Sequence, residues 1–164
     1  MRSLPILWKR LVKEGATCPR CGSTHESVVS AVKKLEAALQ PLGIEPVLET
    51  LAIDETSFQA DPSESNRIWI AGKPLEEWLG ARVGASKCCT VCGDLPCRTM
   101  EIGDSIHETI PEDLIVRAAM MAASGMIGSD PTSANPSARA SLCRARRAPR
   151  STSLRVQASV RSPR

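Results

Sequence analysis

The sequence predicts a small α/β sandwich, built from a strand–helix–strand unit, a β-hairpin and a terminal helix. Two observations support this fold class. The chain has 164 residues, of which 42% are hydrophobic, which is enough for one modest domain with a packed core. Segments with helical spacing of apolar residues also alternate with short strand-like runs. A right-handed crossover between the first two strands would make them parallel.

The first third of the chain supplies the strand–helix–strand unit. Residues 4–12 carry large apolar side chains and are predicted to form the first strand. A loop with two cysteines follows, and Ser23 and Glu26 then match a capping box, which predicts the start of a helix. Apolar residues continue at helical spacing until Pro41 ends the helix. The second strand is predicted over residues 44–53.

The rest of the domain supplies the hairpin and the terminal helix. The segments expected next are a polar loop (54–66), a third strand (67–71), a short edge strand or helix start (74–79) and a cysteine-rich loop (87–98). Thr109 and Glu112 match a second capping box, and Pro111 is expected in the first turn of the last helix.

The composition divides the chain into a domain at 1–127 and a tail at 128–164. The tail holds eight arginines, one acidic residue and neither lysine nor aromatic residues. Such a segment buries too little apolar surface to offset its ordering entropy, so we predict that it is disordered. It could be a basic arm for nucleic acid or anionic lipid. Alternatively, the tail did not evolve as part of the protein and results from translation of a GC-rich stretch in the wrong reading frame.

Several partner classes are disfavoured by composition. Aromatic residues make up only 2% of the chain, which argues against a base-stacking surface for single-stranded nucleic acid. No run approaches the ~18 to 20 apolar residues of a membrane-spanning helix, and the amino-terminal apolar run is too short for a signal peptide. We therefore expect a cytoplasmic protein, whose thiols stay reduced unless they are catalytic or metal-bound.

The cysteines are the strongest functional signal. Six of the seven fall in two groups, which are Cys18 and Cys21 in the first and Cys88, Cys89, Cys92 and Cys97 in the second. A Cys-x-x-Cys pair before a helix favours redox chemistry, because the helix N-terminus and Arg20 would lower the pKa of Cys18. Cys21 would then be the resolving thiol. If the helix begins only after Ser23, its dipole acts more on Cys21.

Metal binding is the alternative chemistry for the same residues. Cys18 and Cys21 could join Cys89 and Cys92 in a tetrahedral zinc site, but 67 residues separate the two pairs, against about 15 to 20 in zinc ribbons. The second group alone could hold zinc, copper(I), an iron–sulfur centre or a toxic thiophilic metal or metalloid. One of the adjacent Cys88 and Cys89 could instead be a packing residue.

Four segments together resemble a bacterial and archaeal domain family of unknown function that is grouped with thioredoxin-like folds. They are residues 17–24, 66–80, 88–98 and 110–115, and the resemblance covers about residues 5–127. It implies a thioredoxin-like sandwich with Cys18 as the attacking thiol and Cys21 as the resolving one. One departure is that Ser65 and Asn66 stand where a thioredoxin-like chain has a cis-proline. The second cysteine group is another departure.

Two hypotheses follow. The first is a thioredoxin-like protein, a possible thiol–disulfide oxidoreductase, with thiol–disulfide or thiol–metal chemistry at Cys18 and Cys21. Its partner would be a protein dithiol or disulfide, or a soft metal ion. The second is a non-catalytic module that binds zinc, an iron–sulfur centre or a soft metal through Cys18, Cys21 and the cysteines of residues 88–97.

Overall fold

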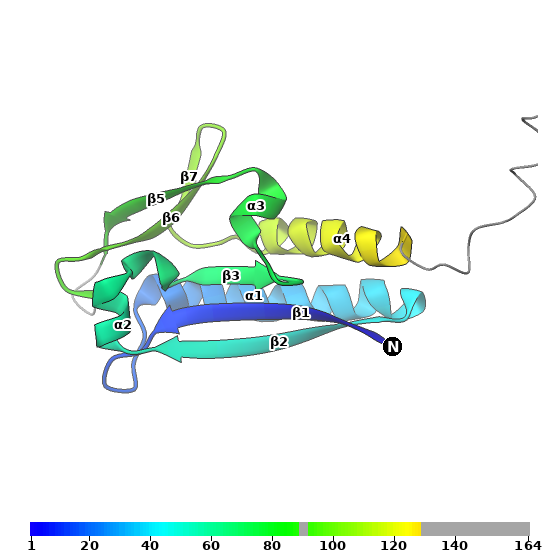
Figure 1. Ribbon diagram of the computed structural model, residues 1–164, viewed down its shortest axis with the longest axis horizontal. Coiled ribbons are helices and arrows are strands. Elements are labelled where there is room, and N and C mark those ends of the chain that lie inside the picture. Colours follow the sequence, from blue (N-terminus) through cyan, green and yellow to red (C-terminus); the bar gives the residue numbers. More distant parts are fainter. Residues whose placement is uncertain (89–91, 129–164) are drawn as a thin grey trace, which may run out of the picture. The chain divides into compact units, whose positions relative to one another are not determined.

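Four strands form the main sheet of the computed structural model, which describes residues 1–88 and 92–128 (Figure 1). They are β1 (Arg2–Leu11), β2 (Ile44–Ile53), β3 (Arg67–Ile70) and β4 (Lys73–Pro74), in the order β2-β1-β3-β4. β1 and β2 are parallel, as predicted, with a register that runs from Arg2 opposite Ile44 to Leu11 opposite Ile53. β3 is antiparallel to β1 and forms the predicted hairpin with β4.

Two long helices pack on one face of this sheet. α1 (Pro19–Leu39) runs behind β1 in Figure 1, and α4 (Glu112–Gly128) lies beside α1. The side chains that alternate along β1 toward these helices are apolar and buried: Leu4, Ile6 and Trp8. A short 3-10 turn, η1 (Gln40–Leu42), ends α1, and Gly43 adopts the left-handed conformation (φ 67°) that a glycine permits.

A second sheet, which the sequence analysis did not predict, includes both ends of the predicted cysteine-rich loop. It consists of the antiparallel strands β5 (Arg82–Lys87), β6 (Pro96–Ile102) and β7 (Ser105–His107), in the order β5-β6-β7. The prediction of a loop over residues 87–98 was therefore wrong at both ends. These strands lack apolar alternation, because β6 buries Arg98 and Thr99 among its apolar residues.

The helix starts also differ from the predictions. α1 begins at Pro19 rather than after Ser23, and α4 begins at Glu112, so Pro111 precedes the helix. The helix starts that the two capping-box motifs predicted were therefore both wrong.

The predicted polar loop at 54–66 contains α2 (Glu55–Ala60) and the 3-10 turn η2 (Pro62–Glu64). Asp54 caps α2, because its Oδ1 accepts a hydrogen bond from the Ser57 N–H at 2.7 Å, and Phe58 anchors the helix in the core. Residues 74–79 combine both predicted alternatives, since Pro74 ends β4 and α3 (Leu75–Leu79) follows directly.

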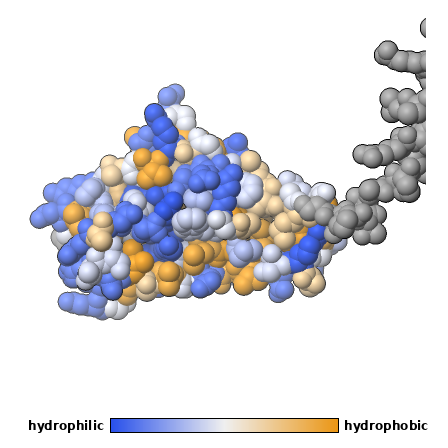
Figure 2. Space-filling model, in the orientation of Figure 1, coloured by the Kyte–Doolittle hydropathy of each residue, from blue (hydrophilic) through white to orange (hydrophobic). Residues whose placement is uncertain are grey.

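One edge of the main sheet stays open to solvent in the described part of the chain. Figure 2 shows hydrophobic side chains along the lower edge of the view, where β2 runs in Figure 1. On β2, Val47 and Leu51 are large apolar residues that remain exposed. Within residues 1–88 and 92–128, no helix has the length and apolar character needed to cross a membrane.

The predicted tail lies almost entirely outside the described residues, as do Cys89 and Cys143. The division into a domain at 1–127 and a disordered tail at 128–164 therefore stays a prediction.

Candidate metal centre

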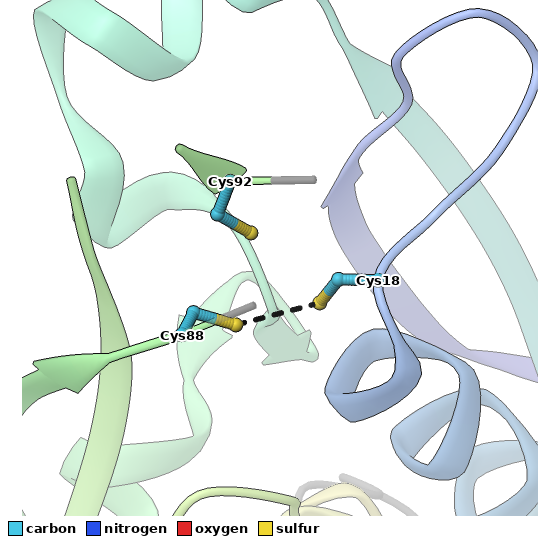
Figure 3. Close-up of side chains that lie close together, drawn as sticks. All are labelled: Cys18, Cys88 and Cys92. Atoms are coloured by element: carbon cyan, nitrogen blue, oxygen red, sulfur yellow. Dashed lines mark hydrogen bonds between the residues drawn. The ribbon is translucent and has the colours of Figure 1, made fainter. Parts of the chain in front are cut away.

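Cysteines from the two sequence groups meet in space. The Sγ atoms of Cys18, Cys88 and Cys92 all lie within 4.8 Å of one another, and those of Cys18 and Cys88 are 3.9 Å apart. Figure 3 shows the three sulfurs turned toward a common point. They come from the loop before α1, the residue after β5 and the segment that precedes β6. We call these three residues the thiol triad, and they could hold a metal ion.

Cys18 is the N-cap residue of α1. Its Sγ accepts a hydrogen bond from the backbone N–H of Cys21 at 3.5 Å, and its carbonyl accepts one from Gly22 N–H at 2.9 Å. Pro19 occupies the first turn, where its fixed φ suits a helix start and no N–H is needed. This proline was the signal for the true helix start that the capping-box motif obscured.

The surrounding thiols stabilise Cys18 as a thiolate. A hydrogen bond from the Cys21 thiol lowers the pKa of Cys18 well below its ordinary value, and a further one from Cys97 adds to this effect. Burial acts in the opposite direction but is outweighed. The pKa of Cys21 is raised, because that thiol donates to Cys18, is buried and lies beside its negative charge.

Two thiols of the second cysteine group, those of Cys92 and Cys97, have raised pKa values. Burial raises the pKa of Cys92 to about 12. The pKa of Cys97 is also raised, first by its hydrogen bond to Cys18 and then by burial. A metal ion bound here would displace protons from these thiols, since thiolate is the ligand form.

Cys21 is not a member of the triad, and its thiol contacts Ser65, which precedes β3. It is 2% exposed, and its Sγ lies 3.8 Å from the hydroxyl of Ser65. That hydroxyl also accepts a hydrogen bond from the Leu11 N–H at 3.0 Å, and the next residue, Asn66, has a φ of 58°. Ser65 therefore occupies the position beside the cysteine pair where the resemblance implied a cis-proline. No cis peptide bond occurs among residues 1–88 and 92–128.

Arg20 joins the start of α1 to the end of β5. Its guanidinium donates to the Ser86 hydroxyl at 2.8 Å and to the Lys87 carbonyl at 2.7 Å, and it pairs with Glu108 at 2.7 Å. These contacts hold the residue before Cys88 against the helix that carries Cys18. The sequence analysis expected Arg20 to lower the pKa of Cys18, but its side chain is engaged with β5 and Glu108 instead.

A buried arginine anchors the start of β6. Arg98 pairs with Glu76 at 2.6 Å and donates to the Ser63 carbonyl at 3.1 Å, and both Arg98 and Glu76 are buried. Cys97, the preceding residue, is thereby held close to the triad. Sequence reasoning missed this anchor, because its partners lie more than twenty residues away along the chain and no local motif announces them.

A cavity of about 130 Å³ adjoins the triad on the side of α2. Its lining includes Leu11, Lys13, Glu55, Phe58 and Cys92. Lys13 and Glu55 form an ion pair at 2.8 Å on the protein surface. A small solute in this cavity would therefore lie next to Cys92.

The structure thus brings three of the six predicted site cysteines into the triad, Cys21 and Cys97 interact with Cys18, and Cys89 lies outside the described residues. Residues 4–119 match the model of a family described as a domain of unknown function, DUF2703. An uncharacterized protein from Archaeoglobus fulgidus is 43% identical over 112 residues, which cover 68% of this chain and 82% of that protein. No solved structure matches the chain. In agreement with the resemblance to a family of unknown function, the chain belongs to the DUF2703 family.

Proposed function

We propose that this protein binds a thiophilic metal ion through the thiol triad of Cys18, Cys88 and Cys92. The observation that carries the proposal is the spacing of the sulfurs. With Zn–S bonds of about 2.3 Å, two thiolates of a tetrahedral site lie about 3.8 Å apart. Cys18 and Cys88 are 3.9 Å apart, so two ligands need almost no movement, and Cys92 lies within 4.8 Å of both.

Cys97 is the candidate for a fourth ligand. It is buried, and its thiol is hydrogen-bonded to Cys18. Four thiolates would close a structural zinc site, whereas three would leave a position open, as in sites that exchange a ligand. Thiolates favour zinc, copper(I) and iron–sulfur centres over hard cations. We therefore propose zinc or another soft ion as the ligand.

Metal titration of the reduced full chain under anaerobic conditions tests this proposal. We expect one zinc ion per chain, and cobalt(II) in its place should give the sulfur-to-cobalt charge-transfer absorption of a thiolate site. Cys18→Ser or Cys88→Ser should weaken zinc binding by more than ~100-fold, since even the loss of a group that hydrogen-bonds to a metal ligand costs about 10- to 100-fold. Cys143→Ser, outside both groups, is the matched control. Unchanged zinc affinity in both triad variants would contradict the proposal.

A second candidate function is thiol–disulfide exchange at Cys18 and Cys21 in a thioredoxin-like sandwich. Three observations favour it: the position of Cys18 at the N-cap of α1, its lowered pKa, and a chain order of βαβ unit, hairpin and terminal helix. Its partner would be a protein dithiol or disulfide. Both functions need reduced thiols, which supports a cytoplasmic location.

Reduction of a protein disulfide by the reduced chain tests this second function. We expect turnover with the unaltered chain and none with Cys18→Ser, because Cys21 then lacks the cysteine with which it would form the disulfide. Full turnover in Cys18→Ser would contradict the assignment of the nucleophile.

A further inference from the structure

The sulfur of Cys18 contacts both the other members of the thiol triad and Cys21. On one side it contacts the other two triad members, Cys88 and Cys92, within 4.8 Å. On the other side it accepts a hydrogen bond from the backbone N–H of Cys21 at 3.5 Å. Cys21 does not belong to the triad, although it is the Cys-x-x-Cys partner of Cys18. One sulfur therefore serves two possible bonding arrangements.

We propose that metal binding and disulfide formation exclude each other at Cys18, so that oxidation of Cys18 and Cys21 by a small disulfide releases the metal ion. This inference rests on the proposed metal site. A sulfur that is bonded in a disulfide is no longer a thiolate ligand, and loss of Cys18 would leave only Cys88 and Cys92 of the triad. By linkage, bound metal would protect Cys18 from oxidation to the same extent.

The position of Cys21 suits a resolving thiol. It is 2% exposed, so an external disulfide reaches it poorly, but its own backbone N–H donates to the Cys18 sulfur at 3.5 Å. Ser65 holds its sulfur at 3.8 Å.

The exchange balances with a low-molecular-weight disulfide as the oxidant. Cys88 is half-buried whereas Cys18 is 3% exposed, so Cys88 attacks the incoming disulfide first, and one thiolate leaves. Cys18, whose sulfur is 3.9 Å away, attacks the Cys88 sulfur and expels the second thiolate. Cys21 then gives its proton to a departed thiolate and attacks Cys18, which frees Cys88. The protein loses two electrons and the oxidant gains two.

Zinc-loaded full-length protein, treated with hydroxyethyl disulfide, provides the test. We expect release of one zinc ion, measured with a chromophoric indicator, for each Cys18–Cys21 disulfide found by peptide mass mapping. A dithiol reductant should restore zinc binding. Cys21→Ser, compared with the unaltered chain after both are saturated with zinc, should release the bound ion at least tenfold more slowly on treatment with the disulfide. Cys21→Ala serves the same purpose without adding a hydroxyl, and Cys143→Ser is the matched control.

The possible outcomes distinguish a failure of this inference from a failure of the proposed metal site. Equal zinc release from Cys21→Ser and the unaltered chain would overturn the inference while the metal site stands. A Cys18–Cys88 disulfide as the stable product would overturn it too. Failure of the reduced chain to bind zinc or another soft ion would instead refute the metal site, and the exchange with it.

Discussion

Replacement of Arg20 by alanine would separate the start of α1 from the end of β5 without touching a cysteine. The substitution removes two charge-assisted hydrogen bonds, to the Ser86 hydroxyl and the Lys87 carbonyl, and an ion pair with Glu108. Cys18 and Cys88 lie on the two segments that these contacts join. We expect weaker metal binding, because the two sulfurs would be less firmly held at their present spacing.

The size of this effect follows from the exposure of the contacts. A hydrogen bond to a charged group contributes about 1.5–3 kcal/mol when it is well sheltered. Here the Lys87 carbonyl can turn to water, the Ser86 hydroxyl keeps a bond to Glu108 at 2.9 Å, and the Glu108 carboxylate is half-exposed. We therefore expect Arg20→Ala to lose about 1.4–2.8 kcal/mol of zinc-binding free energy. This loss corresponds to ~10- to 100-fold weaker zinc binding.

Competition titration with a zinc indicator measures the affinity, and thermal unfolding of the same samples measures stability. Arg20→Lys should recover only part of the affinity, because an ammonium group lacks the forked geometry of a guanidinium. Arg82→Ala is the matched control, since Arg82 lies on β5, the strand that Arg20 contacts, is 81% exposed and pairs with Glu101 at 3.3 Å. If Arg20→Ala binds zinc within twofold of Arg82→Ala, our reasoning about Arg20 is wrong. A lower unfolding temperature with unchanged affinity would reduce its role to structural support.

Three further predictions concern stability and reactivity. Thr24→Val should lower the free energy of unfolding by about 1–3 kcal/mol in denaturant titrations, because fully buried Thr24 accepts the Ile110 N–H at 3.1 Å. Thr24→Ser should keep that bond, and equal stability of both variants would contradict the argument. In the reduced, metal-free chain at pH 6, a small alkylating reagent should label Cys18 before Cys92, because the Cys21 thiol lowers the pKa of Cys18 while burial raises that of Cys92 to about 12. Equal labelling in mass spectra would show that Cys18 is no thiolate. Deletion of residues 128–164 should leave the unfolding temperature unchanged within error, and a large drop would mean that this segment packs on the domain.

Local sequence patterns predicted the main sheet, because its strands show regular apolar spacing and are bounded by turn residues. β2 spans the predicted 44–53, and the turn before Lys73 and Pro74 closes the expected hairpin. β1 and α1 were also found, although α1 begins at Pro19 rather than after Ser23. Where apolar spacing and turn residues agree, the sequence is sufficient to recognise an element.

The second sheet escaped prediction because its buried residues are not all apolar. Arg98 is buried in β6, and its charge is compensated by Glu76 and by the Ser63 carbonyl, which lie far away in the sequence. A period-two pattern of hydrophobic residues cannot reveal a strand whose core-facing residue is a paired arginine. The same holds for α2, whose Asp54 cap and Phe58 anchor lie in a polar segment.

From the sequence alone we could predict thiol chemistry, two groups of cysteines, and a helix that follows the first group. The meeting of Cys18 with Cys88 and Cys92, and the contact of Cys21 with Ser65, became visible only in the folded chain. The physical reason is distance along the chain. Spacing within a Cys-x-x-Cys motif restricts two sulfurs to one neighbourhood, but a meeting across about seventy residues depends on how β5 packs against α1. That packing rests on contacts such as those of Arg20, which no local pattern encodes.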